Sequence, residues 1–124
     1  MAESPAGFPR SVRLLTRADY GRVFAKPLRA SDGCFTVLAR SNGLSTGRIG
    51  LAIAKKHVAR AVARNRIKRI ARETFREVQQ ELAGLDLVVL SRHGTQACSS
   101  SELRASLVKQ WKYLVRQCRS SSSC

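Results

Sequence analysis

The fold depends most on one stretch, KKHVARAVARNRIKRIARETFR, which runs from Lys55 to Arg76. Read as a helix at about 100° per residue, its later part divides into two faces. One face is apolar and is suited to a core: Ala63, Ile67, Ile70, Ala71, Thr74, Phe75, Val78 and Leu82. The opposite face is polar and basic: Asn65, Arg66, Lys68, Arg69, Arg72 and Arg76. We therefore expect an amphipathic helix from about Ala59 to Leu82, whose outer face needs either water or a polyanion.

The whole chain shares this positive charge. Its 124 residues include 23 Lys and Arg against 8 Asp and Glu, a formal net charge of +15. The length suggests one domain, and the 44% hydrophobic content is enough for a core. So large a charge attracts anions, of which nucleic acid is our first choice and an anionic membrane surface the second.

No apolar run approaches the ~20 residues of a membrane span, and the opening MAESPAGFPR lacks the apolar part of a secretory signal. We expect a cytoplasmic protein.

The rest of the sequence predicts further helices and strands around the basic helix. Apolar spacing predicts helices at residues 17–25 and 102–118, with Thr16 as N-cap of the first and Ser100 or Ser101 as N-cap of the second. β-branched and aromatic runs predict strands at residues 34–40, 48–54 and 85–92, the first two forming an antiparallel hairpin. The predicted order is α-β-β-α-β-α, an α+β fold with three helices on a small, mostly antiparallel sheet. Residues 1–12 are expected to form a flexible arm, 13–118 a single domain and 119–124 a disordered tail.

One predicted strand carries a strip of small side chains. Ile49, Leu51 and Ile53 face one side of it, and Gly50, Ala52 and Ala54 face the other. Small side chains let another group approach the sheet closely. That group is either a packed helix, which we favour from the residues alone, or the backbone or a base of a nucleic acid.

The sequence shows no catalytic constellation. Neither His57 nor His93 has a carboxylate close by in sequence, and both are expected to lie on the surface. No pair of acids suggests general acid–base or two-metal chemistry. Three acids follow one another on the basic helix at i,i+4 spacing and are expected to pair with arginines one turn away: Glu73, Glu77 and Glu81.

The four cysteines are scattered, at positions 34, 98, 118 and 124. They form no CxxC pair, and no histidine lies at metal-ligand spacing. In a reducing compartment we expect neither a metal site nor a disulfide.

Two sets of side chains are suited to binding RNA. The first is the basic helix, where arginine and lysine neutralise phosphates and Asn65 can read a 2′-hydroxyl or a base edge. A merely solvated face is the alternative. Arg64 lies at the margin of the apolar face, which suggests an unwound first turn or a side chain aimed into a cleft beside the sheet.

The second set is aromatic: Tyr20, Phe24 and Phe35, bordered by Arg17, Arg22, Arg48 and Lys56. Such side chains can stack unpaired bases, or they belong to the core.

The segment ARNRIKRIARETFR, Ala63 to Arg76, closely resembles the signature helix of the bacterial ribonuclease P protein subunit. Other segments are similar to that family in order and spacing: FPR (8–10), RLLTRADYGRVF (13–24), RIGLAIAKK (48–56) and LDLVVLSR (85–92). The resemblance covers nearly the whole chain apart from the two tails. It implies a ribosomal protein S5 domain 2-like fold with a left-handed β-α-β crossover, against the usual right-handed rule.

The resemblance also implies a function. The chain would be the protein subunit of a ribonucleoprotein endonuclease that removes the 5′ leader from precursor tRNA, giving the mature 5′ end. The catalytic RNA would carry out hydrolysis with Mg²⁺ that it holds itself, so this chain would supply neither catalytic nor metal-binding residues. One chain would bind one catalytic RNA and a precursor tRNA, with no membrane role and no protein partner required.

The resemblance places the contacts of the chain in two groups. The implied contacts with the catalytic RNA are Arg60, Arg64, Asn65, Arg66, Lys68, Arg69 and Arg72. The implied contacts with the leader are Tyr20, Phe24, Phe35, Leu38, Ala52 and Lys56. Tyr20 stands where phenylalanine is common, and Leu38 and Ala52 stand where some relatives carry an aromatic residue and a hydroxyl. Leader contacts at these last two positions are therefore expected to be weaker or purely steric.

Two other hypotheses also rest on the binding of nucleic-acid phosphates by the basic helix. One is a structural RNA-binding protein, such as a ribosomal component. The other is a DNA-binding helix in a major groove, which is disfavoured because a strand precedes the basic helix where a helix–turn should stand.

Overall fold

The computed structural model describes residue 13 and residues 17–25 and 27–120. The predicted N-terminal arm, the N-cap at Thr16 and residues 121–124 of the predicted tail lie outside the described residues. Residues 119 and 120, which we expected in the tail, continue the last helix.

The described chain contains three α-helices, a short 3₁₀ turn and four strands. The helices are α1 (Arg17–Ala25), α2 (Ala61–Glu77) and α3 (Ser100–Ser120), and the turn is η2 (Thr95–Ala97). The strands are β1 (Leu28–Ser31), β2 (Phe35–Ser41), β3 (Arg48–Ala52) and β4 (Leu85–Ser91). The predicted α+β class is confirmed. Sequence reasoning missed β1, whose four residues are too few for a clear alternating pattern.

The strands form one mixed sheet in the order β1-β2-β4-β3. β2 runs antiparallel to β1 and β4, whereas β3 runs parallel to β4 and reaches it through α2. The predicted hairpin between residues 34–40 and 48–54 is therefore wrong, because β4 lies between these two strands. β4 is largely apolar on both faces, and all of its residues except Leu90 are buried, which suits a central position.

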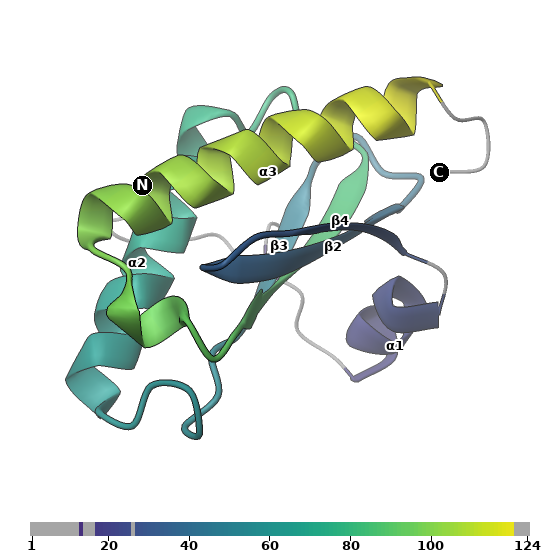
Figure 1. Cartoon of the computed structure of the whole chain (residues 1–124). Coiled ribbons are helices and arrows are strands. Elements are labelled where there is room, and N and C mark those ends of the chain that lie inside the picture. The colour runs from purple at the N-terminus through teal and green to yellow at the C-terminus, as the bar shows by residue number, and fades with distance from the viewer. Residues whose placement is uncertain (1–12, 14–16, 26, 121–124) are drawn as a thin grey trace, which may run out of the picture.

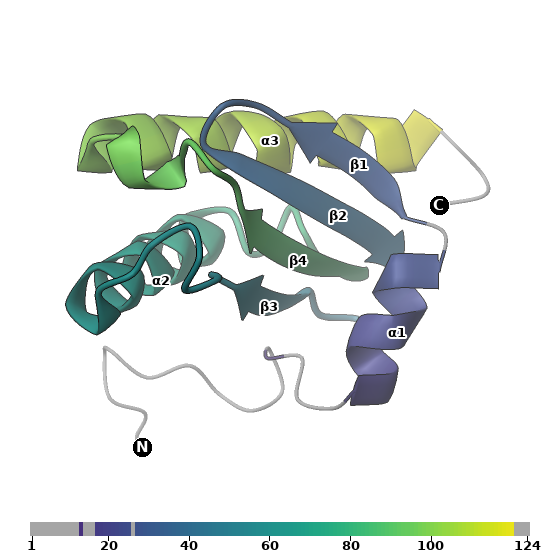
Figure 2. The ribbon, with the colours of Figure 1, turned by 60° about the horizontal axis from the view of Figure 1, so that its bottom comes forward.

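The helices cover the two faces of the sheet unequally (Figures 1 and 2). α2 and α3 pack together on one face, while α1 lies alone against β2 and β4 on the other. The main core lies under α2 and α3, where Phe75 meets Trp111 edge to face with ring centroids 6.2 Å apart. A smaller apolar cluster, formed by Val23, Leu38 and Val88, lies under α1.

α2 is shorter than predicted but keeps the predicted division of faces. Its buried residues are Ile67, Ile70, Ala71, Thr74 and Phe75. Turns follow Glu77 up to Gly84, whose φ of +86° is a backbone conformation that favours glycine. These turns stand where we expected the last helical residues, and they reverse the chain into β4.

α3 begins with a capping box. The Ser99 hydroxyl accepts a bond from the Glu102 amide at 3.1 Å, and the Glu102 carboxylate accepts one from the Ser99 amide at 2.8 Å. The N-cap is therefore Ser99, one residue before the two serines that we predicted.

Cys34 and Cys98 form a disulfide, which corrects our expectation of unpaired thiols. Cys34 immediately precedes β2, and Cys98 follows η2. Their 64-residue separation hid the pairing, because sequence spacing carries no information on contacts made through the sheet.

Candidate nucleic-acid interface

A cavity of about 560 Å³ lies on the sheet face that carries α1. We call it the α1 cavity and define it by its lining: Phe24, Pro27, Arg29, Thr36, Leu38, His57, Leu90, Ser91, Arg92 and His93. Two arginines, two histidines and no carboxylate line it. A cavity of this composition suits an anionic ligand with flat apolar groups.

The aromatic member of the cavity is Phe24. Its side chain is 48% exposed, an unusual state for phenylalanine. The nearly buried Leu38 supplies apolar floor and packs with Val23 of α1. Phe24 therefore lies exposed at the edge of an apolar floor and beside cations, and its stacking on a base stays a prediction.

His57 and Ser91 meet in this cavity through the sheet. The Ser91 hydroxyl accepts a bond from the Ala54 amide at 2.9 Å, and its oxygen lies 2.8 Å from His57 Nδ1. Ser91 can donate to Nδ1 in the tautomer protonated at Nε2, or accept from Nδ1 in the other tautomer. His57 is thus held in the cavity lining by Ser91 with its Nε2 left for a ligand, whereas the sequence suggested an ordinary surface histidine.

Sequence reasoning missed the polar half of the α1 cavity for a topological reason. Ser91, Arg92 and His93 lie at the carboxyl end of β4, and His57 follows the carboxyl end of β3. These ends are neighbours only because β3 and β4 run parallel, and the predicted hairpin concealed that arrangement. A cluster of polar residues directly after each of two parallel strands is the sequence pattern that indicates such a site.

The other implied leader residues are placed differently. Phe35 has no exposed surface and lies in the main core, so the expectation that it contacts the leader is corrected. The strand alternation explains this, because Phe35 and Leu38 face opposite sides of β2. Ala52 and Lys56 are exposed but do not line the α1 cavity.

Tyr20 packs on the strip of small residues. A Cβ atom added to Gly50 would lie 2.7 Å from the Tyr20 ring and hydroxyl, so only glycine leaves room for α1 at this point. The packed-helix interpretation of the strip is confirmed at Gly50. Tyr20 is half-buried in this contact and fixes α1 rather than lining the cavity.

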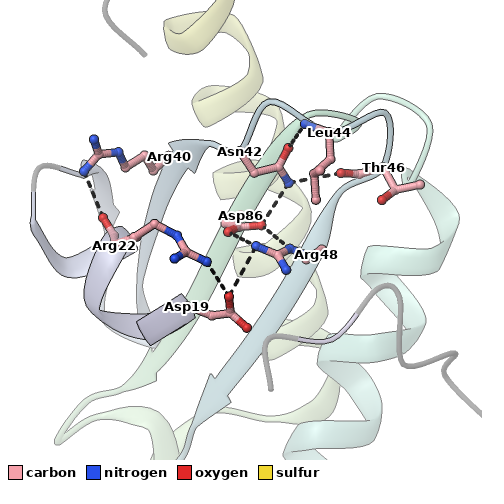
Figure 3. Close-up of polar contacts among 8 residues, drawn as sticks. All are labelled: Asp19, Arg22, Arg40, Asn42, Leu44, Thr46, Arg48 and Asp86. Carbon is pink, nitrogen blue, oxygen red and sulfur yellow. Dashed lines mark hydrogen bonds and ion pairs between the residues drawn. The ribbon is translucent and has the colours of Figure 1, made fainter. Parts of the chain in front are cut away.

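A buried ion pair also fastens α1 to the far end of the sheet (Figure 3). Arg48 donates two bonds to Asp86, at 2.8 and 2.7 Å, and its Nη2 lies 3.7 Å from Asp19 of α1. The bonds to Asp86, which outweigh the burial, raise the pKa of Arg48. Asn42 donates a further bond to Asp86 at 2.9 Å. Arg48 is therefore a structural residue and not the border of an aromatic site that we predicted.

α2 presents a separate basic surface, the α2 face. Asn65, Lys68, Arg69 and Arg72 follow one another at i, i+3, i+4 and i+7, so they form one stripe on the side away from the buried residues. None of the four forms an ion pair with another described residue. Arg60 is exposed at the N-cap of the same helix. This stripe is free to neutralise phosphates.

Arg64 and Arg66 differ from that stripe. Arg64 donates to the carbonyl oxygens of Val58 and Ala59, at 3.0 and 2.8 Å. It therefore holds the segment before α2 in place, and neither an unwound turn nor a cleft explains it. Arg66 donates to the Ser100 hydroxyl at the start of α3.

The acids of α2 are neutralised from another helix. Arg104 of α3 reaches Glu73 at 2.8 Å and Glu77 at 3.2 Å. The expected pairing of these acids with arginines of their own helix is thus corrected for Glu73 and Glu77. As a result the acids lie toward α3 and leave the α2 face basic.

In the part of the chain that the structure describes, no group of three His, Cys, Asp or Glu side chains is placed to hold a metal ion. None of the helices in these described residues is both long and apolar enough to cross a membrane.

The fold and its two basic surfaces define the class: a small α+β nucleic-acid-binding protein. The sequence model of the Ribonuclease P family matches residues 8–115, and the chain belongs to this family. It is 50% identical over 115 residues to the ribonuclease P protein component of Nitrosococcus oceani, covering 93% of this chain and 97% of that one. It is 45% identical over 117 residues to that of Methylococcus capsulatus, covering 94% and 91%.

Solved structures agree with this assignment. The RNase P protein of Staphylococcus aureus superposes with a TM-score of 0.75 at 26% identity, covering 84% of this chain and 97% of that one. The RNase P protein of Thermotoga maritima gives 0.68 at 29% identity, covering 84% and 96%. As a member of this family, the chain is the protein subunit that takes part in the removal of tRNA 5′ leaders.

Proposed function

We propose that this chain binds two RNAs at once: the catalytic RNA of ribonuclease P on the α2 face and the leader of precursor tRNA in the α1 cavity. The observation that carries this proposal is the separation of the two surfaces. α2 packs on one side of the sheet, and the α1 cavity opens on the other.

The α2 face is suited to structured RNA. Lys68, Arg69 and Arg72 are presented by a rigid helix, so phosphates that match their spacing are bound with little loss of backbone freedom. Asn65 lies on the same stripe and can donate to or accept from a 2′-hydroxyl, which DNA lacks. The contacts that we assign to Arg64 and Arg66 are structural first, since both already bond within the protein.

The α1 cavity is suited to an unpaired strand. Phe24 offers a face to a base, and the apolar floor at Leu38 excludes water beneath it. Arg29 and Arg92 line the same cavity and offer charge to phosphates, while His57 offers a ring nitrogen for a hydrogen bond with a base edge or a sugar hydroxyl. We therefore replace Phe35 in the proposed leader site with these residues.

The division of labour follows from the side chains that are present. Mg²⁺ held by the catalytic RNA would supply the hydrolytic chemistry, and the protein would supply binding and charge neutralisation. A net charge of +15 weakens the repulsion between two polyanions. Magnesium ions otherwise perform part of that neutralisation, so the protein should matter most where magnesium is scarce. We propose one chain per catalytic RNA, in the cytoplasm.

The test is single-turnover cleavage of a precursor tRNA by the catalytic RNA at low Mg²⁺, with and without this chain. We expect cleavage at the mature 5′ end to be accelerated by the chain and the acceleration to shrink as Mg²⁺ rises. No acceleration at any Mg²⁺ concentration contradicts the proposal. Co-sedimentation of the chain with ribosomal subunits, in place of the catalytic RNA, would instead favour a ribosomal component.

A further inference from the structure

A second basic cavity, of about 430 Å³, lies around the free edge of the sheet. We call it the edge cavity and define it by its lining: Arg29, Ala30, Ser31, Lys109, Gln110, Tyr113 and Arg116. β1 is the outermost strand, and α3 packs against it. The edge cavity therefore sits in the angle between β1 and the second half of α3.

The side chains that α3 contributes form one stripe. Lys109, Tyr113 and Arg116 follow at i, i+4 and i+7, so they point the same way. Tyr113 is 41% exposed, and no carboxylate lines the edge cavity. An exposed aromatic ring among cations is the surface that unpaired nucleic acid uses.

Arg29 joins the two cavities, because it lines both of them. Its neighbour Ala30 faces the core under α3, so strand alternation directs Arg29 to the face that carries α1. In the described chain two aromatic residues have strongly exposed side chains, Phe24 and Tyr113, and one lies in each cavity. The basic surface thus continues around the β1 edge from one aromatic ring to the other.

Gln110 adds an unused acceptor to the lining. It is 2% exposed, and its Nε2 donates to the Phe35 carbonyl at 3.3 Å and to the Ser106 hydroxyl at 3.1 Å. Its Oε1 has no hydrogen-bond partner among the described residues. A 2′-hydroxyl or a base amino group would satisfy such an acceptor after a small shift of the side chain.

We propose that the edge cavity binds the leader nucleotides upstream of those held at Phe24. The strand would pass Arg29, turn around the edge of β1 and stack one base on Tyr113, with Lys109 against a phosphate. This inference rests on the proposed function, because it extends the path of the same RNA strand.

The test is a leader-length series, in which the affinity of the assembled holoenzyme is measured for precursor tRNAs whose leaders lengthen one nucleotide at a time. With the unchanged chain, affinity should rise with leader length and then reach a plateau. Tyr113→Ala should reach its plateau at a shorter leader and lose roughly 5- to 150-fold in affinity for the longest leaders only, the range for one stacked base. Tyr113→Phe should restore the series, since the ring is kept.

Three comparisons make the outcome decisive. Lys112→Ala removes an exposed charge from α3 outside both cavities and should leave the series unchanged. Phe24→Ala should weaken binding of every leader that is long enough to reach the α1 cavity, including leaders too short to reach Tyr113. A loss with Tyr113→Ala that is equal for all leaders, or no loss at all, overturns the edge-cavity proposal while leaving the α1 cavity standing. A flat series with the unchanged chain would overturn the proposed function itself.

Discussion

The aromatic side chains of this protein differ in what they are free to do. Phe35 and Trp111 are fully buried, Tyr20 is held over Gly50, and Phe24 is 48% exposed beside Arg29. Only exposed rings can stack on a base without unfolding part of the core. Exposure therefore leaves Phe24 available for binding and assigns Phe35 to the core, a choice that composition alone left open.

Phe24→Ala should weaken binding of leader-bearing precursor tRNA by about 1–3 kcal/mol, the value of one stacked base. Mature tRNA should bind as before, because it has no leader. Leu44→Ala is the matched control, since Leu44 is 49% exposed and lies outside the α1 cavity. A fall in melting temperature without a change in substrate preference would show that Phe24 serves the fold.

Arg69 and Arg64 are five residues apart in sequence, but their substitutions should affect different properties. Arg69 should affect RNA binding, and Arg64 should affect stability. Arg69→Ala should reduce the slope of log K against log salt for catalytic-RNA binding by about one and leave stability unchanged. Arg64→Ala removes two bonds to backbone carbonyls and should cost about 1–3 kcal/mol in urea unfolding. An unchanged salt slope for Arg69→Ala would place that side chain in solvent.

At the scale of elements, the position of α1 depends on a buried charge. Asp86 is 3% exposed and holds Arg48, which in turn approaches Asp19 of α1. Asp86→Asn removes the nearer of the two carboxylates that Arg48 reaches and should destabilise the protein by about 3 kcal/mol. Because α1 carries Phe24, affinity for the leader should fall as well.

Arg104→Ala provides the comparison for that ion pair. Its partners Glu73 and Glu77 are exposed, so the loss should be at most about 1 kcal/mol. Equal destabilisation by Asp86→Asn and Arg104→Ala would contradict the structural role that we assign to the Arg48–Asp86 pair.

Asp32 links the β1–β2 turn to α3. Burial disfavours its charge, but bonds from the Ser106 hydroxyl and from the Phe35 and Cys34 amides outweigh burial and lower the pKa of Asp32 below its ordinary 3.8. The folded state therefore gains stability above the unfolded pKa of about 4, and loses it as pH falls toward the lowered value. Urea unfolding between pH 6 and 2 should show a smaller acid-induced loss in Ser106→Ala than in the unchanged chain. Parallel curves would contradict this link.

A feature of this fold can be predicted from the sequence when the residues that determine it lie within a single helix or strand. The amphipathic patterns of α2 and α3 and the apolar run of β4 lie within single elements, so their existence was predicted correctly. Strand pairing is not local: β2 and β3 are neighbours in sequence yet pair on opposite sides of β4. The same holds for the contact between His57 and Ser91 and for the disulfide between Cys34 and Cys98. The candidate residues on α2 could thus be named from the pattern of one helix, whereas those at the meeting of β3 and β4 could not.

At the scale of the whole molecule, charge is sorted into separate surfaces. The acids Glu73, Glu77 and Asp86 form ion pairs with arginines of neighbouring elements, and Asp19 pairs both with Arg22 of its own helix and with Arg48 of β3. Excess cations therefore remain on the α2 face, in the α1 cavity and around the β1 edge. A protein built in this way can contact one RNA from one side of the sheet and a second RNA from the other.

The most direct test of this two-sided binding compares affinities for precursor and mature tRNA. Each should be measured with the catalytic RNA alone and with the assembled holoenzyme, at one fixed salt and Mg²⁺ concentration. We predict that the chain tightens binding of precursor tRNA and leaves mature tRNA unchanged, because only the precursor carries a leader to occupy the α1 cavity. Equal tightening of both tRNAs, or of neither, would contradict the account.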